Sequence, residues 1–546
     1  MRCKIVAACL ILAAWVAPAR AQTFPMPDYF HELIYSPQPP QPLPDTQGFR
    51  DYIIDGKLRL SLQDAMLLLL EHNTEVHIDR LAVTDAEYNV ERSLANFDPA
   101  LASTFNTDRT KSPTYSQLQG APTLSDLEQQ TTFGYTQTLQ TGTNFNLGLS
   151  ADKSSNNSIY NFLNPSISAS LNFTVTQPLL RGNGRFVNRA PILIARRIVT
   201  QTAAQFEGQV SDSLYQLVAV YWNVVQAREN MKIAQKSQDL AQASYDRDKR
   251  ALELGALPPL DIYQSEAQVA NRKVAVIQAQ YQLKYMEDQF RHLLGADQDA
   301  EVRALDLDLV ENPEPSGELV QADTKEAVAT ALAHRPELEA LRQQMAANDI
   351  TVRLDRNNLL PNLSLTGLYR SNGLGGNQYD TAVTPPVLLS RGGLGDAFGQ
   401  IGGFSYPTYG FTLSLNLPIK NHSAEANLGT ALVSRRRSQY QARQQEEDIT
   451  LQVAEAVHQL EQACISLDAS RVAFDLSRKS LEAEERKYQL GAQTIYFVLQ
   501  AQTVLASAEA AVLQAEISYQ LARANVDHAT GMLLSHYKIE VQKIKS

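Results

Sequence analysis

Two places in the chain carry a histidine and a glutamate three positions apart, a spacing that could present metal ligands on one helical face. The pairs are His72 with Glu75 and His334 with Glu337. Zinc sites need three or four protein ligands, and each place offers two. Both pairs also lie at the start of a duplicated segment, so a structural role is favoured over a metal site. We expect no bound metal or cofactor.

The other motifs that could carry chemistry are also weak. The segment RGNGR, residues 181–185, lacks the strand-to-helix pattern of a phosphate-binding loop, and its glycines suit the exit from a strand into a helix. Asp51, Asp55 and the acidic run at 446–448 are most simply solvated surface. The sequence shows no paired nucleophile and base. We therefore predict that the protein is not an enzyme.

The chain contains an internal duplication, and this duplication organises the elements. It matches itself at an offset of 262 through Leu70/Leu332, His72/His334, Glu75/Glu337, Pro99/Pro361 and Leu101/Leu363, and at an offset of 236 through Leu254/Leu490, Gly255/Gly491, Ala256/Ala492, Gln264/Gln500 and Gly295/Gly531. Between these matches, TQPLL (176–180) corresponds to LNLPI (415–419). The unit is far longer than solenoid repeats. It predicts one object built from two similar halves.

The first residues read as an export signal. A basic start precedes a short apolar run and a small-residue site at 19–21, which predicts cleavage after Ala21. Cleavage removes Arg2, Lys4 and Arg20, so the formal net charge changes from −11 to −14, which disfavours nucleic acid as a partner. Cys464 is then the one cysteine left. No later apolar run reaches the ~20 residues of a membrane helix, so any membrane crossing must use strands.

Each half contains one very long helix that ends at a Leu-Gly-Ala break. The first is expected from Asn188 to Leu254, which at ~1.5 Å per residue would reach ~100 Å, and the second from Asn427 to Leu490. Apolar residues in both recur at steps of three and four, which is coiled-coil spacing, and charged residues fill the other faces. These helices are expected to pack on one another in water.

Alternating segments between the helices predict β-strands. In residues 167–176, 144–151 and 409–415, apolar side chains alternate with Ser, Thr, Asn and Gly, as in transmembrane barrel strands. The alternative is a strand of a soluble sandwich with one buried face. A small soluble sheet between helices of ~100 Å has no obvious core of its own. A membrane barrel carried on a helical tube therefore fits both patterns better.

The whole plan resembles the TolC-like outer-membrane efflux protein family, also called outer membrane factors. The residues that carry this resemblance are DGKLRLSLQDAMLLLLEHN (55–73), Pro99 and Pro361, TQPLLRG (176–182) and the paired LGA breaks, and it covers about residues 56–535. It implies a mixed α and β membrane protein: a homotrimer sharing one outer-membrane β-barrel, with antiparallel coiled-coil helices forming a periplasmic α-barrel. The location implied is the outer membrane of a Gram-negative-type cell, with a large periplasmic portion.

The function implied is a passive export conduit of a tripartite efflux or type I secretion system, opened by an inner-membrane pump and a periplasmic adaptor (membrane fusion protein). The alternative is an adaptor-like bridging protein without a barrel, but such a protein should show one helical hairpin and a lipoyl-like β domain. The cargo and the pump class are not visible in the sequence. Gly255 and Gly491 would then mark the turns where the partners dock.

Together these patterns predict a signal at 1–21, a proline-rich extension at 22–55, a first repeat at 56–296, a linker at 297–323, a second repeat at 324–535 and a tail at 536–546. One feature departs from the family, whose usual plan has two strands per repeat. Residues 131–151 of the first repeat add two alternating runs around a tight turn at 140–142. This hairpin either enlarges the barrel or extends beyond it.

The resemblance also suggests where the inner end of the tunnel closes. In related channels two aspartates after the second break ring the entrance, and a tyrosine and an arginine nearby belong to the bonds that hold it shut. The matching positions here are Phe497 and Gln500 for the aspartates, Tyr488 for the tyrosine and Gln493 for the arginine. An acidic match occurs only in the first repeat, at Asp261. Asp261 either contributes to a ring of carboxylates at the entrance or caps the helix that follows Pro259. Our hypothesis is a gate made of a Phe497 constriction and one acidic ring.

Overall fold

The computed structural model describes residues 46–254, 262–296, 300–315, 319–320, 322–383, 385–490 and 492–539. The predicted signal, most of the proline-rich extension, and Gly255, Asp261 and Gly491 lie outside these residues. The chain divides into two compact units, 1–47 and 48–546, and the elements below belong to the second, except that η1 begins at Thr46.

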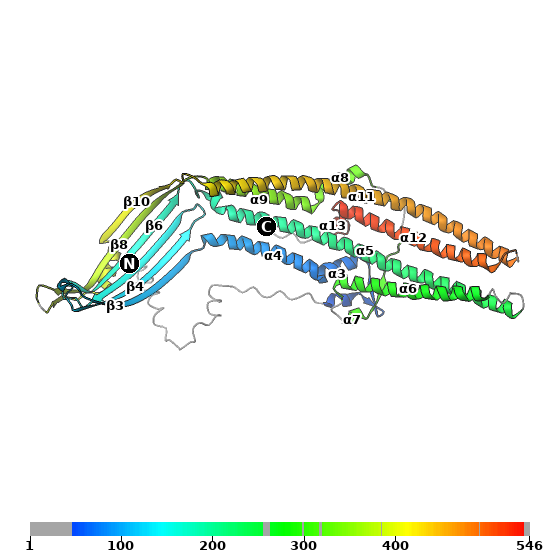
Figure 1. Cartoon of the computed structure of the whole chain (residues 1–546), viewed down its shortest axis with the longest axis horizontal. Helices are drawn as coiled ribbons and strands as arrows, with labels where there is room; N and C mark the ends of the chain where they lie inside the picture. Colours follow the sequence, from blue (N-terminus) through cyan, green and yellow to red (C-terminus); the bar gives the residue numbers. More distant parts are fainter. Residues whose placement is uncertain are drawn as a thin grey trace. The chain divides into compact units, whose positions relative to one another are not determined.

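Two long helical hairpins dominate this unit (Figure 1). Helix α5 (Arg185–Glu253) is followed by α6 (Ile262–Leu294), and α11 (His422–Gln489) is followed by α12 (Ile495–Ala529). The predicted long helices are confirmed to within a few residues, because their three-and-four spacing of apolar residues continues to each Leu-Gly-Ala. Pro191 lies in the second turn of α5, where it removes one backbone hydrogen bond of the helix.

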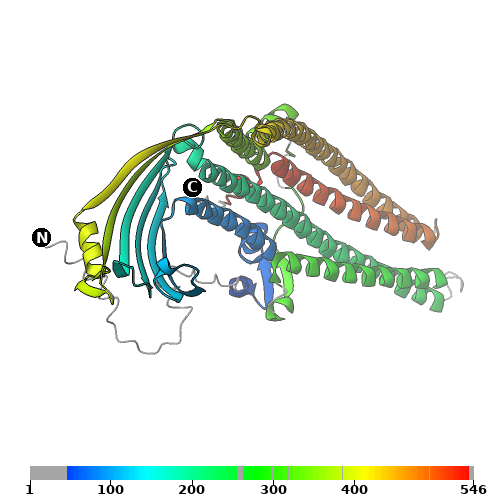
Figure 2. The same cartoon turned by 60° about the vertical axis from the view of Figure 1, so that its left-hand side comes forward.

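Six long strands form one antiparallel sheet at the other end of these helices (Figure 2). They are β3 (Ala100–Pro113), β4 (Thr123–Thr138), β5 (Asn144–Asn156), β6 (Leu163–Pro178), β8 (Asn362–Asp380) and β10 (Tyr406–Asn416), in the spatial order β10-β8-β6-β5-β4-β3. The short strand β9 (Val387–Ser390) pairs with the far end of β8. The alternation correctly predicted β5, β6 and β10.

The hairpin at 131–151 is part of this sheet. Its strands β4 and β5 lie between β3 and β6 and pair with both of them along their length. The turn closes with Gly142 at a φ of 89°, a conformation that glycine adopts without strain. Of the two alternatives left open by the sequence, the structure shows the one in which the hairpin enlarges the sheet.

The sheet has one polar and one apolar face. A continuous row of paired residues crosses all six strands on the apolar face and consists of Leu101, Tyr135, Leu147, Phe173, Tyr369 and Tyr409. The opposite face carries Ser170, Asn172 and Thr174 of β6 and their neighbours. The apolar side chains remain exposed, to 82% at Phe411. An exposed apolar band of this kind is typical of a lipid-facing barrel wall.

A short helix that the sequence did not predict, α10 (Leu394–Gly402), packs on the apolar face of β6 and β8. Its Ala397 and Ile401 are buried against Ala169. The Gln400 side chain donates to the carbonyl oxygen of Leu374 and accepts from its N–H, both at 2.9 Å. These bonds satisfy the β8 backbone beyond the point where β10 pairs with it.

Gly373 on β8 lies directly under α10, and a methyl group there should destabilise the fold. A Cβ at Gly373 would overlap the carbonyl oxygen of Ala397, whereas a Cβ at Gly367, on the same face of the same strand, would meet nothing within 4 Å. We expect Gly373→Ala to cost about 1–3 kcal/mol and Gly367→Ala to cost little. The heat-unfolding midpoint of the detergent-purified protein checks this, and equal midpoints for the two variants would contradict it.

A smaller sheet and the shorter helices occupy the middle of the unit. Strand β2 pairs with β1 and, in parallel, with β7 of the predicted linker, so that segment is bound to the fold. The first described element, η1, begins at Thr46, within the predicted proline-rich extension at 22–55. The remaining elements are η1 (Thr46–Tyr52), β1 (Ile53–Ile54), β2 (Lys57–Leu60), α3 (Leu62–His72), α4 (Thr74–Leu94), η2 (Ala95–Phe97), η3 (Gln117–Gln119), α7 (Ala300–Arg303), β7 (Asp306–Leu309), α8 (Thr324–His334), α9 (Pro336–Asn358) and α13 (Leu533–His536).

The two histidines considered as metal ligands have equivalent backbone contacts, although the His72 side chain is buried and His334 is exposed. Gly295 and Gly531 follow α6 and α12 with φ of 74° and 73°. A Cβ there would lie 2.7 Å from the carbonyl oxygen of His72 or 3.2 Å from that of His334. The His72 ring is buried beside Phe49, with centroids 4.7 Å apart. Among the described residues, no group of three or more His, Cys, Asp or Glu could hold a metal ion.

One expectation about membrane segments is wrong. Within the described residues, α12 is long and apolar enough to pass a composition test for a membrane helix, although no such run was expected after Ala21. The same helix packs along α11 and α5, although only 17% of its most apolar 18-residue stretch is buried within one copy. Ile517 and Tyr519 of α12 are buried in these contacts.

Candidate entrance and gate region

The free end of the second hairpin carries all the described gate candidates, Tyr488, Gln493, Phe497 and Gln500. Helix α11 ends at Gln489, and α12 begins at Ile495 with Thr494 as its N-cap residue. The first turns of α12 bury Ile495, Val498 and Leu499 in a cluster. Tyr488 of α11 packs against this cluster. The second hairpin is thus closed by apolar contacts directly beside its turn.

Tyr488 also connects the two hairpins. The guanidinium of Arg247, on α5, lies 5.1 Å from the centroid of the Tyr488 ring. A cation at this distance from an aromatic face is attracted to the ring, by about 0.5–1 kcal/mol at an exposed site. The sequence prediction of Tyr488 as a gate residue did not include Arg247, because Arg247 comes from the other repeat.

Phe497 and Gln500 lie on the opposite side of α12 from this cluster. Phe497 is 44% exposed and contacts the Tyr496 ring edge-on, with centroids 5.5 Å apart. Gln500 is exposed, and Gln493 is half-buried. The structure therefore separates the predicted set: Tyr488 packs inside the protomer, while Phe497 and Gln500 face away from its core.

A buried carboxylate that sequence reasoning missed joins α5 to α6 near the first turn. Asp248 is fully buried and accepts a hydrogen bond from the Ser265 hydroxyl. The Nε of Arg247 lies 3.8 Å from its other carboxylate oxygen. At the repeat offset of 236, Asp248 corresponds to Glu484, which binds Lys487 at 2.7 Å. An acidic residue six positions before each LGA break was the signal available in the sequence.

Polar contacts between the hairpins continue above the tips. Gln268 and Arg272 of α6 both donate to the Thr503 hydroxyl of α12, at 3.2 and 2.6 Å. Further along, Lys236 of α5 lies 3.1 Å from Glu509 of α12. These bonds are few and partly exposed. Such contacts can exchange for water at modest cost when two hairpins separate.

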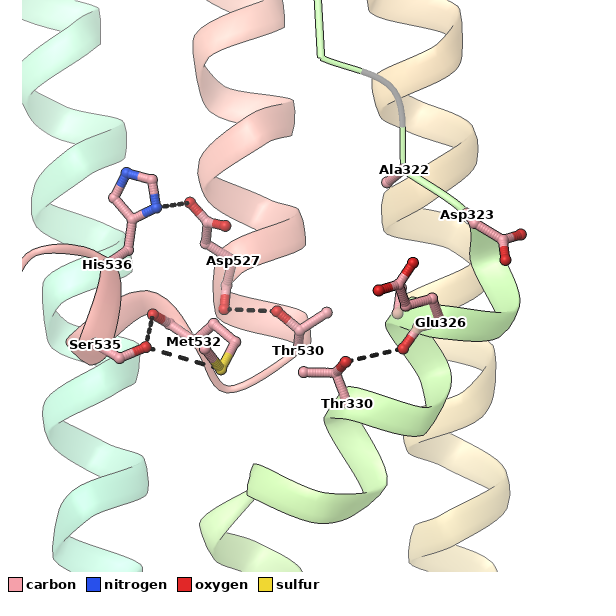
Figure 3. A pocket seen from close by; sticks show the side chains of 10 residues that line it. Ala322, Asp323, Glu326, Thr330, Asp527, Thr530, Met532, Ser535 and His536 are labelled. Carbon is pink, nitrogen blue, oxygen red and sulfur yellow. Dashed lines mark hydrogen bonds and ion pairs between the residues drawn. The ribbon is translucent and has the colours of Figure 1, made fainter.

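A cavity of about 580 Å³ lies farther from the tips, between the linker, α8 and the α12–α13 corner (Figure 3). Its polar lining includes Asp527, whose carboxylate lies 3.4 Å from the Nδ1 of His536. Burial raises the pKa of the Asp527 carboxyl above its usual value, although His536 and Arg523 act in the opposite direction. The cavity is a feature of the junction between the repeats.

The raised pKa of Asp527 predicts a pH-dependent contribution to stability. A carboxyl whose pKa is raised by folding favours the folded state at low pH, and this contribution is lost as the pH rises through the folded-state pKa. The substitution Asp527→Asn removes the charge at every pH. We expect its unfolding temperature, relative to wild type, to rise between about pH 4 and about pH 7.5. If the difference in unfolding temperature between Asp527→Asn and wild type stayed constant over this pH range, Asp527 would not be the titrating group.

Comparison with known proteins shows which protein family has this architecture. The model of the outer membrane efflux protein family matches residues 143–296 and 327–532. Outer membrane efflux protein BepC of Brucella suis is 25% identical over 341 residues, which cover 61% of this chain and 67% of that protein. The family is one of transport conduits, and the match does not favour the adaptor alternative.

Solved outer-membrane channels share the fold. The structure of CusC superposes with a TM-score of 0.63 at 16% identity, covering 91% of this chain and 99% of that one. The Campylobacter jejuni CmeC channel gives 0.61 at 14% identity, covering 90% and 89%. The open state of the Neisseria gonorrhoeae MtrE channel gives 0.59 at 18% identity, covering 86% and 89%.

The resemblance predicted from the duplicated helix-strand plan is confirmed by the family match and by the fold of these channels. The chain therefore belongs to the outer membrane efflux protein family and is an outer-membrane efflux channel component, with a large periplasmic part.

Proposed function

We propose that three copies of this chain form one conduit, in which their sheets close into a single barrel and their helices into a periplasmic tunnel. The observation that carries this proposal is that both edge strands of the large sheet, β3 and β10, have an unpaired side among the described residues. Among the described residues, β3 pairs only with β4 and β10 only with β8, and both edge strands are exposed along nearly their whole length. Open backbone edges are not tolerated in lipid.

The two edges are also complementary. All five long strand pairs are antiparallel, so β10 and β3 run in opposite directions. The β10 edge of one copy can therefore pair antiparallel with the β3 edge of the next. One copy has too few strands to enclose a channel, whereas three copies can do so.

The helices carry matching exposed apolar rows on the same two sides. Figure 1 shows α4 and α6 on one side of α5 and α11 on the other. On α6 the exposed row is Val274, Ile277, Tyr281 and Tyr285, and on α11 it is Leu451, Ile465, Val472 and Leu476. Steps of three and four, and of one or two heptads, in these rows are coiled-coil spacing. When copies of a chain join through two different complementary surfaces, they form a closed ring if the rotations from one copy to the next add up to a full turn.

The hairpin tips would then form the inner entrance and the docking site for a periplasmic adaptor and an inner-membrane pump. Phe497 and Gln500, which face away from the protomer core, would line this entrance. Asp261, outside the described residues, would add a ring of carboxylates there or cap the helix after it. The family relation supports efflux, and co-purification of the inner-membrane partner would identify the pump class and the cargo.

The turns provide the direct test of docking. We expect Gly255→Pro or Gly491→Pro to reduce adaptor co-purification and cargo export, because proline restricts a turn that needs backbone freedom. Insertion into the outer membrane and the trimer yield should remain at wild-type levels, because α5 and α11 end at Glu253 and Gln489, at the opposite end of these helices from the sheet (Figure 1). Normal export by both variants would show that the turns are not the docking surface.

A further inference from the structure

The β4–β5 hairpin has no counterpart in the second repeat. Pro99/Pro361 and Leu101/Leu363 align β3 with β8, and TQPLL and LNLPI align the ends of β6 and β10. The first repeat thus has four long strands where the second has two. Between β8 and β10 the second repeat places β9 and α10 instead. The usual plan of two strands per repeat is therefore kept in the second repeat and exceeded in the first.

We infer that this hairpin builds two additional wall strands into each protomer, so that the barrel has 18 strands and a wider lumen than the 12-stranded barrel of the usual plan. The inference rests on the proposed trimer. Its basis is that β4 and β5 lie inside the sheet, between β3 and β6, with 14, 13 and 11 paired positions across the three junctions. A hairpin that did not contribute to the barrel wall would lie outside the sheet and would not separate β3 from β6.

The hairpin also follows the rules of a barrel wall. Two added strands leave β3 and β6 antiparallel, so the edges that meet between copies keep their directions. The faces are also preserved, because Tyr135 and Leu147 of the hairpin stand in one row with Leu101 of β3 and Phe173 of β6. The opposite face of the hairpin presents Thr132, Asn146 and Ser150, which suit a water-filled lumen.

The expected consequence is a wider outer vestibule. Barrel diameter grows roughly linearly with strand number, so 18 strands give a diameter about 1.5-fold that of 12 strands. Barrels of about 16–18 strands leave an aqueous channel. The helical tunnel is unaffected by the insertion, because the hairpin returns to β6 before α5 begins. The inferred difference therefore concerns only the barrel.

The deletion of residues 123–156 is the sharpest test. It removes both strands and joins two segments that lie at the same end of the sheet, because β3 ends and β6 begins there. A single reporter cysteine, Thr412→Cys, is placed on the polar face of β10, in a background with Cys464→Ser. Maleimide-coupled polyethylene glycols of graded size are then added outside intact cells.

We expect the largest polymer that reaches the reporter to have a hydrodynamic radius about 1.5-fold greater in wild type than in the deletion variant. Cryo-electron microscopy of the wild-type particle should show 18 wall strands. A trimer with 12 wall strands and an external hairpin, or equal exclusion limits, would overturn the inference. A wild-type monomer would instead overturn the trimer itself. If the deletion variant does not fold, the strand count of the wild-type trimer decides.

Discussion

The substitution Ile465→Glu should abolish the trimer. Ile465 lies in the exposed apolar row of α11 and is 72% exposed in one copy. If a neighbouring copy covers this row, the variant loses about 1.5–3 kcal/mol of apolar burial at each of three interfaces. An unpaired carboxylate enclosed there adds to the loss. Light scattering of the detergent-purified protein should report monomers, and cargo export should be lost.

The next residue supplies a matched control. Ser466 is exposed, and its side chain lines a cavity between α11 and α12 within the same copy. Ser466→Glu introduces the same charge on the same turn, but outside the apolar row, so it should leave the trimer intact. Equal effects of the two substitutions would show that the row is not an interface, and a folded wild-type monomer would reject the assembly altogether.

Truncation of Phe497 should open the resting channel. In the proposed tunnel, three copies of this 44% exposed ring narrow the inner entrance and make it poorly wetted. Phe497→Ala removes the ring without disturbing Ile495, Val498 and Leu499, which hold the start of α12 on the other side. In planar bilayers we expect a severalfold rise in resting conductance. Phe497→Leu, which keeps an apolar side chain, should remain closer to wild type.

Asp261→Asn separates the two roles considered for the acidic residue. If Asp261 forms a ring of carboxylates, the variant should lose part of the cation preference while the conductance stays low. If it only caps a helix, ion selectivity should be unchanged, because asparagine is an equally good cap. Unchanged conductance in Phe497→Ala, together with unchanged selectivity in Asp261→Asn, would place the gate elsewhere.

The amino-acid sequence alone determined the elements whose periodicity is strong. Helix α5 was expected at 188–254 and is observed at Arg185–Glu253, because an amphipathic pattern of that length has no competing structure. Strands β5, β6 and β10 were also predictable, since each alternates polar and apolar residues along its length. The duplication and the family resemblance followed from the same local patterns and their order.

The tertiary structure decided what depends on neighbours. Strands β3 and β8 have weak alternation: β3 is polar on both faces in its second half, and β8 contains Gly373, Gly375 and Gly376 where α10 and Pro165 approach its backbone. The contact of Arg247 with Tyr488 joins residues from different repeats. The position of the β4–β5 hairpin depends on strand pairing across the sheet. Pairing energies come from partners distant in the chain, so no local pattern contains them.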